Sequence, residues 1–479
     1  MTERRGLSFE GMAIGLLFVV VAARALVMEA QSDTFWALRA GQDLWATGRV
    51  PTVDTYSYTV AGLPWPNHEW LWQAVIYPLH RLGGLPLVTL GASFLVMGAV
   101  ALTYRLMVGA PGTRFLLLLL GVPLASVVWA LRPQIVTLLF LTVLVSMLAR
   151  ERFLALPLLF LAWANAHGGV VLGGLLLGVA FATALARAWL AGPERRAVDR
   201  RRARRLGLVL VPCALAVAAT PMGFQLFRFV VESEGRLRSA HINEWQSTLP
   251  GWSIAGAFWV LALAYAALLL WRARSLRGAS WSDWVVVACV SALLPLAFRS
   301  LRHIGPFILL APAAASRLLG ADFRLRRSAP ASASPSPERP ALNAAILGLF
   351  GVGALASVAI AWKLPVEALG WRPLPDGALD AVRACPGRLY NHYNQGGYLI
   401  WFTPETKVFI DNRQDPYPLP FLLDHLRIES GKLPWEPTFH RWDVRCSFLS
   451  VDSPTVTALE KAGWRDAYRD ERWAVQVAP

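Results

Sequence analysis

Charged residues are scarce in this 479-residue chain, and that scarcity excludes an ordinary soluble protein. Only 16% of the residues are Asp, Glu, Lys or Arg, whereas 55% are hydrophobic and the mean hydropathy is +0.44. These values lie well outside the averages of soluble domains. The composition therefore predicts a polytopic membrane protein.

Cysteines and familiar short motifs are also missing or few. Four cysteines are too few for a disulfide scaffold. Cys213 and Cys289 fall inside apolar runs, so only Cys385 and Cys446 could meet an oxidising compartment. No G-x-G-x-x-G, P-loop, H-E-x-x-H or C-x-x-C motif occurs, and the near match "GVGALA" lies inside an apolar run. Nucleotide binding and the familiar metal sites thus have no support.

Long apolar runs are what the chain does have, and about eleven are long enough to cross a membrane. They span 11–29, 85–107, 114–131, 134–149, 153–166, 169–187, 206–222, 253–271, 281–298, 303–319 and 342–362. The first run predicts a retained anchor, because its one A-x-A match lies inside the run. The pair split by "NAHGG" forms either two crossings or a re-entrant hairpin.

Basic residues gather between the apolar runs, most densely in "RAWLAGPERRAVDRRRARR". The formal net charge of +15 therefore indicates cytoplasmic loops beside anionic lipid, not nucleic-acid binding. With alternating crossings, the N-terminus, the loop 187–205 and the Pro/Ser-rich linker 320–341 are cytoplasmic. The first external loop, 30–84, and residues 366–479 then lie outside.

The tail after the last apolar run predicts a separate extracytoplasmic α/β domain over 366–479, beside a transmembrane domain over 1–365. Strand-like runs "GRLYNHY", "KVFIDNR", "CSFLSVD" and "WAVQV" alternate with the helical patterns "PLPFLLDHLRIES" and "SPTVTALEKAG". This alternation favours a partly parallel sheet.

The first external loop carries acidic residues directly after an apolar run. Its stretch "DTFWALRAGQDLWATGR" has the spacing of an interfacial helix, and "EWLWQAVIYPLHRL" is either a second such helix or the start of the next crossing. Ionisable groups at membrane level are costly unless they are paired or functional. We therefore expect a shared external pocket formed by Asp33, Asp54, His68 and Glu69 of the loop and by Arg132, Gln134, Asn165, His167, Glu244, Arg299, Arg302 and His303 at helix ends.

Such a mixture of side chains suits one kind of chemistry. A carboxylate can take a proton from an acceptor hydroxyl, while Arg or His stabilises a departing phosphate. Glycosyl transfer passes through an oxocarbenium-like transition state with these two requirements. The polar residues thus predict transfer of a sugar from a lipid-linked phosphate.

At these residues the sequence resembles the GT-C superfamily of integral-membrane glycosyltransferases. Asp33 in "SDTFW" matches the acid that follows the first transmembrane helix in that superfamily. More closely, the chain resembles a bacterial group of multi-pass proteins described only as uncharacterised or glycosyltransferase-like. The matching stretches are "DTFWALRAGQDLWATGRVPTVDTYSYT", "GLPWPNHEWL", "LRPQ", "WANAHGG", "EWQS", "LRH", "YNHYNQGGYLIW" and "VFIDNRQD". This narrower resemblance spans most of the chain and brings no known reaction.

The GT-C resemblance implies an inverting transfer of a hexose or pentose at the outer face of the bacterial inner (plasma) membrane. The donor is a polyprenyl-phosphate sugar, and the acceptor is a glycan, lipid or protein of the cell envelope. Asp33 is expected to be the general base, with Asp54 and Glu69 as further acids. Substrate binding falls to His68, Arg132, Gln134, Asn165, His167, Glu244, Arg302 and His303. We expect no obligatory metal, because a lone D…D…HE set is a weak signature, although GT-C members differ in metal use.

Each assignment has an alternative. Asp33 could cap a helix that begins at Thr34, and Asp54 could be a turn residue. Arg132 could extend to the membrane surface, and His167 could be a hydrogen-bonded histidine at a helix end. For the whole chain, the alternatives are a transporter or flippase for a lipid-linked or anionic substrate and an inactive scaffold.

Overall fold

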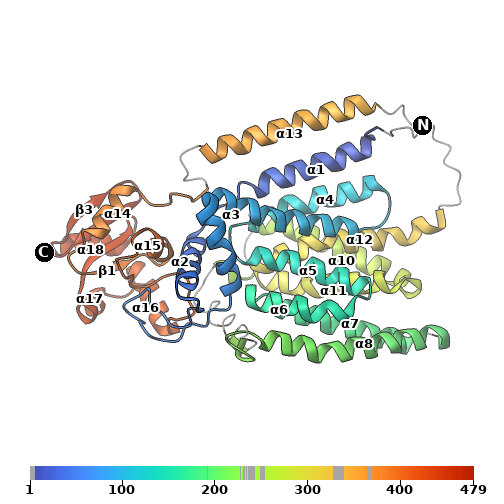
Figure 1. The fold of residues 1–479 in the computed structure, drawn as a ribbon, viewed down its shortest axis with the longest axis horizontal. Coiled ribbons are helices and arrows are strands. Elements are labelled where there is room, and N and C mark those ends of the chain that lie inside the picture. The colour runs from blue at the N-terminus through green and yellow to red at the C-terminus, as the bar shows by residue number, and fades with distance from the viewer. Residues whose placement is uncertain are drawn as a thin grey trace.

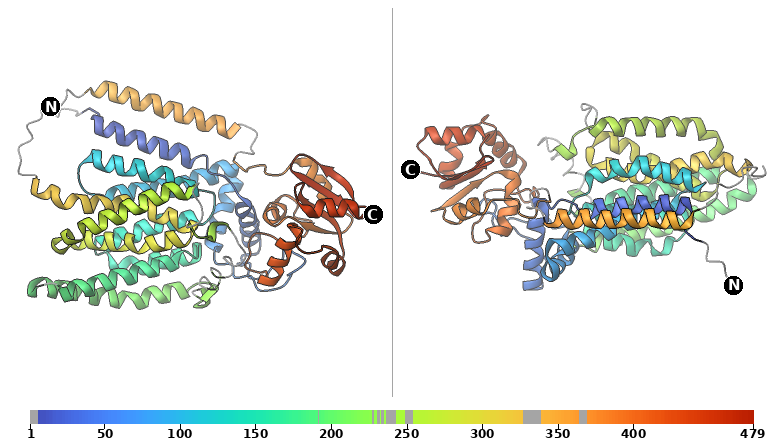
Figure 2. Two further views of the ribbon diagram at one scale, coloured as in Figure 1. Left: turned by 180° about the vertical axis from the view of Figure 1, so that it is seen from behind. Right: turned by 90° about the horizontal axis from the view of Figure 1, so that it is seen from above.

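The computed structural model describes residues 6–190, 192–226, 228–229, 232, 235, 243–248, 254–326, 339–363 and 369–479. A bundle of long helices carries a smaller α/β domain at one of its ends (Figure 1). The two parts are continuous through α2 and the connections around it, which lie between the bundle and the domain (Figures 1 and 2).

Every apolar run predicted to cross the membrane coincides, wholly or in large part, with a helix. These helices are α1 (Phe9–Ala25), α3 (Trp70–Leu106), α4 (Pro111–Ala125), α5 (Gln134–Ala149), α6 (Leu156–Ala166), α7 (Val170–Leu190), α8 (Pro193–Ala218), α10 (Ile254–Arg272), α11 (Trp281–Arg299), α12 (Ile304–Arg326) and α13 (Pro340–Lys363). Within the described residues, seven are long and apolar enough to span a membrane: α3, α4, α7, α10, α11, α12 and α13. The polytopic α-helical class is confirmed, but eleven crossings are not.

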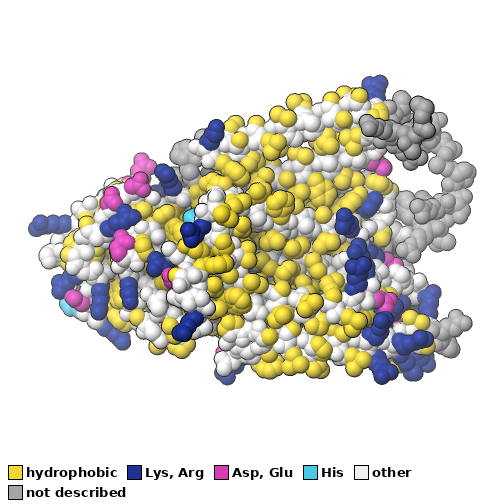
Figure 3. Space-filling view, in the orientation of Figure 1, with side chains coloured by type: hydrophobic (Ala, Val, Ile, Leu, Met, Phe, Trp, Pro, Cys, Tyr) yellow, Lys and Arg dark blue, Asp and Glu magenta, His cyan; other side chains and the backbone are white. Residues whose placement is uncertain are grey.

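The arginine-rich run is helical, so the prediction of a loop over 187–205 was wrong. α7 continues to Leu190, and α8 starts at Pro193, a residue that suits the first turn of a helix. Arg202 is buried against Trp281, 4.6 Å from the ring centroid, and forms ion pairs with Asp199 and Glu151. Charge pairing thus stabilises a helix where composition alone indicated a solvated loop. The basic end of α8 lies at the end of the bundle opposite the C-terminal domain (Figures 1 and 3).

The predicted interfacial helix is confirmed as a helix, α2 (Ser32–Thr47), and it lies across the end of the bundle (Figure 2). Gln31 is its N-cap, because the side chains of Gln31 and Thr34 form a reciprocal capping box. Asp33 lies inside the first turn. The alternative that Asp33 caps this helix is therefore wrong.

The stretch "EWLWQAVIYPLHRL" is both a second helix and the start of a crossing. It opens α3, which continues to Leu106 but is broken where Gly83 and Gly84 leave the helical conformation. Gly84 has a φ of +63°, a backbone conformation that residues with a side chain rarely adopt. The segment before this break packs on α2, and the segment after it runs into the bundle.

The C-terminal domain is an α/β unit with a partly parallel sheet, as predicted. Its elements are α14 (Asp376–Arg383), β1 (Arg388–Asn391), α15 (Gly396–Phe402), α16 (Leu419–Glu429), α17 (Glu436–Trp442), β2 (Val444–Ser450), α18 (Pro454–Lys461), β3 (Arg465–Arg469) and β4 (Trp473–Val477). The sheet order is β1-β2-β4-β3; β1 and β2 are parallel, and the other neighbours are antiparallel. A disulfide joins Cys385 to Cys446.

Two details of the predicted sheet were wrong. "KVFIDNR" is not a strand of the sheet, because the Asn391 side chain binds both the Phe409 amide and the Ile410 carbonyl at 2.8 Å. The segment instead pairs with the loop after α2, where Val408 and Tyr56 form a 3.1 Å backbone hydrogen bond. In addition, the mostly exposed strand β3 lacks the apolar alternation that would have predicted it.

Candidate active site

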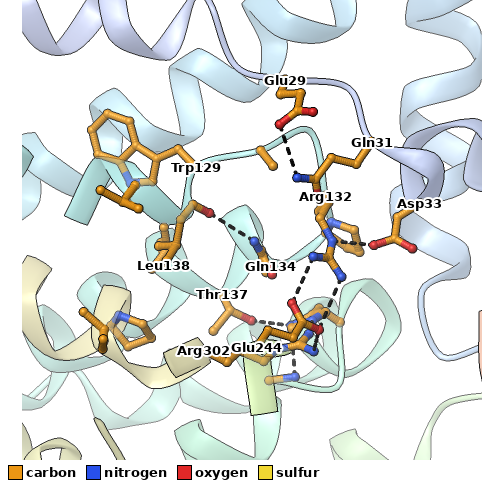
Figure 4. A pocket seen from close by; sticks show the side chains of 18 of the residues that line it. Glu29, Gln31, Asp33, Trp129, Arg132, Gln134, Thr137, Leu138, Glu244 and Arg302 are labelled. Carbon is orange, nitrogen blue, oxygen red and sulfur yellow. Dashed lines mark hydrogen bonds and ion pairs between the residues drawn. The ribbon is translucent and has the colours of Figure 1, made fainter. Parts of the chain in front are cut away.

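A cavity of about 1900 Å³ lies at the end of the bundle nearest the C-terminal domain. Its lining comes from the bundle helices α1, α4, α5, α7, α11, α12 and α13 and the connections between them, from α2 and the residues before α3, and from residues 412–415 of the C-terminal domain. Figure 4 shows Asp33, Arg132, Glu244 and Arg302 converging from separate elements. The space is ample for a lipid-linked sugar, since ordinary ligand pockets measure about 300–1,000 Å³.

Asp33 faces this cavity from the first turn of α2. Its Oδ2 lies 2.5 Å from Arg132 Nε, and its Oδ1 accepts hydrogen bonds from Trp36 Nε1 at 3.2 Å and from Asn412 Nδ2. The residue is only 8% exposed. Burial raises the pKa of Asp33 above its ordinary value, although the Arg132 charge acts in the opposite direction. The result is a fixed carboxylate with raised proton affinity.

Glu244 bridges two arginines across the cavity. Its carboxylate lies 3.0 Å from Arg132 Nη1 and 3.1 Å from Arg302 Nη1, and the Arg302 guanidinium stacks on Trp245 at 4.9 Å. Burial raises the pKa of Glu244, but Arg132 and Arg302 outweigh that effect and lower it to about 2. Two guanidinium groups therefore converge on one anionic group at the cavity wall, a geometry that suits phosphate as well as carboxylate.

His167 extends the network from the connection between α6 and α7. Its Nε2 lies 3.0 Å from Arg302 Nη2, and its Nδ1 lies 2.7 Å from Thr137 Oγ1, which also accepts from Trp163 Nε1. Burial and the Arg302 charge lower the pKa of His167 to about 3, although Glu69 opposes them. Because a guanidinium can only donate, the neutral imidazole accepts through Nε2. His167 thus orients Arg302.

Glu69 and His68 form the next part of the wall. Glu69 Oε1 lies 3.5 Å from His68 Nε2 and 3.8 Å from His167 Nε2, while His68 Nδ1 lies 3.9 Å from Asp415 Oδ2. Burial lowers the pKa of His68, but Glu69 and Asp415 outweigh it and raise that pKa to about 9. Burial raises the pKa of Glu69, but the hydrogen bond and charge of His68, together with the charge of Arg302, lower it below its ordinary value, so Glu69 stays ionised. Glu69 is therefore neutralised by a cationic His68.

The structure brings together most of the predicted site residues. Asp33, His68, Glu69, Arg132, Gln134, His167, Glu244, Arg302 and His303 line the cavity. Asn165 does not, since it is buried beneath, where its side chain binds Trp70 Nε1 and the carbonyls of Leu161 and Ala219.

Asp54 also lies away from the cavity. Its side chain is fully buried, where it pairs with Arg413 and accepts hydrogen bonds from Ser57 N at 3.1 Å and Ser57 Oγ at 2.7 Å. These partners occupy its oxygen atoms, so we assign Asp54 a structural role and not a catalytic one.

Some cavity residues escaped the sequence-based prediction. The side chains of Glu29 and Gln31 precede α2 and lie within 3.4 Å of each other at the cavity (Figure 4). Asn412 comes from a turn 379 residues after Asp33. The "FIDNRQD" stretch is a run of polar groups after an apolar segment, a pattern that can indicate a functional site. Nothing in the sequence indicated that Asn412 of this stretch contacts Asp33.

One wall of the cavity is apolar. It is formed by Val19, Val20 and Ala23 of α1 and Val27 just after it, by Leu349, Phe350 and Ala354 of α13, and by Leu124 of α4 and Val127 and Val128 just after it. Val20 and Phe350 are 59% and 55% exposed, and α13 is scarcely covered by the rest of the protein. The polar wall and a partly exposed apolar wall thus share one space.

Within the described residues, no group of three or more His, Cys, Asp or Glu side chains is placed to hold a metal ion. In the cavity, the Asp33 and Glu244 carboxylates have guanidinium partners, and Glu69 has histidine partners.

No protein-family model matches the chain, and no curated protein matches it in sequence. Solved structures do match in three dimensions. ArnT from Cupriavidus metallidurans in the apo state aligns with a TM-score of 0.52 over 95% of each chain, at 15% identity. The Archaeoglobus fulgidus oligosaccharyltransferase tethered to an acceptor peptide containing the NVT sequon aligns with a TM-score of 0.53, at 11% identity, over 92% of this chain and 69% of that chain. The chain has the GT-C fold.

The apo form of the same oligosaccharyltransferase aligns equally well, with a TM-score of 0.52 at 10% identity. The predicted GT-C architecture, a helical membrane bundle with a C-terminal sheet domain, is therefore confirmed.

Proposed function

We propose that this protein is a membrane glycosyltransferase that moves a sugar from a polyprenyl-phosphate-linked donor to a cell-envelope acceptor. The observation that carries the proposal is the cavity, in which the buried carboxylate of Asp33 faces two converging arginines beside an apolar wall. The GT-C fold, shared with an oligosaccharyltransferase, supports it.

In this proposal each wall has a separate role. The apolar wall binds the polyprenyl chain, and Arg132 and Arg302 bind the phosphate. Asp33 accepts the proton of the acceptor hydroxyl, whose oxygen forms a bond to the anomeric carbon. The bond from that carbon to the phosphate oxygen breaks, and its electron pair leaves with the phosphate, where the guanidinium groups stabilise the charge.

A panel of labelled polyprenyl-phosphate sugars, offered to the purified protein in detergent, tests the reaction. We expect one donor to be consumed with release of polyprenyl phosphate. Detergent removes the second compartment that a transporter or flippase needs, so donor cleavage there supports a transferase. A protein that binds a donor and leaves it intact with every acceptor offered would contradict the proposal.

Arg302→Ala should weaken donor binding. Arg302 donates to Glu244 and His167 in the absence of substrate, and a phosphate that replaces Glu244 is bound in both the ground state and the transition state. The KM for donor should rise by about tenfold, the scale of one charge-assisted hydrogen bond, with a smaller change in kcat. Arg299 was expected in the pocket but does not line it; Arg299→Ala, an exposed change at the end of α11, three residues before Arg302, is the control. Equal effects of both changes would contradict the assignment.

The cavity is proposed to face the outside, with the basic end of α8 in the cytoplasm. Arginine bias supports this orientation, because the basic run and the C-terminal domain lie at opposite ends of the bundle. Cysteines introduced at the exposed positions Arg201 and Ser430 should react with an impermeant thiol reagent from opposite sides of the membrane. The native thiols do not interfere, since Cys213 and Cys289 are buried and the other two are paired. Reaction of both from one side would contradict the orientation.

A further inference from the structure

The C-terminal domain contributes the turn segment 412–415 to the cavity wall. Elsewhere this domain also packs on α2, where Phe35 contacts Tyr398 and Phe402 of α15. Within the turn segment, Asn412 contacts the carboxylate that the proposed function uses as its base. The contact joins residues of α2 and of the C-terminal domain that lie 379 positions apart.

The orientation of the Asn412 amide is fixed. Its Oδ1 accepts a hydrogen bond of 2.9 Å from Ser32 Oγ, which leaves Nδ2 to donate to Asp33 Oδ1. Trp36 Nε1 donates to the same oxygen at 3.2 Å. Both neutral donors therefore hold Oδ1 and leave Oδ2, beside Arg132, to accept a proton from a substrate in the cavity.

A buried ionic cluster holds the segment in place. Arg413 pairs with Asp411 at 2.7 Å and with Asp54, and its guanidinium lies 4.7 Å from the centroid of Trp65. Tyr417 Oη also donates to Asp411 at 2.7 Å. Because Asp54 belongs to the loop after α2, this cluster fixes Asn412 relative to the helix that carries Asp33.

The backbone beneath the segment has no room for a side chain. A Cβ atom on Gly397 would lie 2.5 Å from the Ser32 carbonyl oxygen and 2.9 Å from Asn412 Oδ1. Glycine at this position lets α15 approach both partners closely. The start of α2, residue 412 and α15 thus form one tightly packed junction.

We propose that Asn412 is a positioning residue for Asp33, so that the C-terminal domain completes the active site instead of serving only as a separate module. This proposal rests on the proposed function of Asp33 as the base. Asn412 aims the carboxylate and favours its ionised form, because its N–H group stabilises charge on Oδ1.

Other groups around Asp33 also affect its ionisation. Those that face it are Arg132, Glu244, Glu69, Tyr393 and Tyr398. Burial raises the pKa of both tyrosines, so they stay neutral in the working range. Despite burial, the pKa values of Glu244 and Glu69 are lowered by their cationic neighbours. The pKa of Arg132 is raised by Asp33 and Glu244, again despite burial, so Arg132 and the two glutamates keep their charges in that range. A change at Asn412 should therefore appear as a change in Asp33 alone.

The pH dependence of transfer tests the proposal. Asn412→Ala removes a donor to ionised Asp33, so the pKa of Asp33 should rise and the acidic limb of the rate profile should move to higher pH. At pH values below the limb, the rate should fall about tenfold for each pH unit by which the limb moves. The KM for donor should stay unchanged. Asn412→Asp keeps the size but adds a like charge, and it should move the limb further in the same direction.

A matched control distinguishes an effect on the position and ionisation of Asp33 from an effect on the thermal stability of the protein. Val456→Ala makes a cavity in the core of the C-terminal domain, away from the site, and should lower thermal stability without moving the limb. If Asn412→Ala and Asn412→Asp lower thermal stability and leave the limb in place, as this control does, Asn412 has no positioning role.

A second measurement does not depend on turnover. The infrared band of the protonated carboxyl group that is lost in Asp33→Asn should titrate at higher pH in Asn412→Ala than in the natural protein. An unchanged titration would overturn the proposal for Asn412. If the natural protein cleaves no donor but this titration moves as expected, the proposed function fails while the contact between Asn412 and Asp33 stands.

Discussion

Asp33→Asn should lower the rate of sugar transfer on the order of a hundredfold or more, with folding and donor binding retained. The amide matches the carboxylate in size and can still accept from Trp36, but it cannot take a proton from the acceptor. Gln31 caps α2, so the change leaves the helix start intact. Initial rates and thermal stability, measured on the same purified protein, check the prediction.

Asp43→Asn is the matched control. Asp43 lies on the same helix, accepts from Tyr56 Oη at 2.8 Å and pairs with Arg39, but does not line the cavity. Its substitution should leave transfer almost unchanged. Full activity in Asp33→Asn, or a loss that only parallels the loss of stability, would remove Asp33 from the chemistry.

Arg413→Leu should have the largest effect on stability. The Arg413 side chain is fully buried and pairs with two carboxylates, those of Asp54 and Asp411, whose side chains are buried too. Its removal leaves uncompensated charge in the interior, which typically costs about 3–5 kcal/mol. Thermal denaturation of the purified protein should show a large fall in the midpoint or failure of the C-terminal domain to fold.

Arg445→Leu is the comparison for this prediction. Arg445 pairs with Asp443 at 2.9 Å in the same domain, but both side chains are more than half exposed. Exposed pairs contribute little, so the midpoint should hardly move. If Arg413→Leu were as stable as Arg445→Leu, the buried cluster would not be what joins the loop after α2 to the C-terminal domain.

The membrane bundle was predictable from the sequence because long apolar runs indicate helices that are buried in lipid. The gathering of Asp33, Arg132, His167 and Arg302 at one end followed from alternating crossings, since parity alone places successive connections on opposite sides. The helical Arg run of α8 was not predictable, because the pairing of Arg202 with Asp199 and Glu151 depends on neighbouring helices.

In the candidate site, the contacts between segments far apart in the chain could not be predicted from the sequence. Asp54 has the local pattern of a turn or a catalytic acid, and only its buried pairing with Arg413 distinguishes a structural role. Asn412 was missed for the same reason. A role for its amide follows only from its contacts with Ser32 and Asp33, which lie 380 and 379 residues away in the sequence.

The fate of a labelled polyprenyl-phosphate sugar in proteoliposomes tests the central claim most directly. The donor would be placed in vesicles that contain the purified protein, together with an acceptor, and both the sugar and the lipid would be followed. A transferase should release polyprenyl phosphate and acceptor-linked sugar in equal amounts, and Asp33→Asn should abolish most of that release. Movement of the intact donor between leaflets, without cleavage and without sensitivity to Asp33→Asn, would contradict the account and identify a transporter instead.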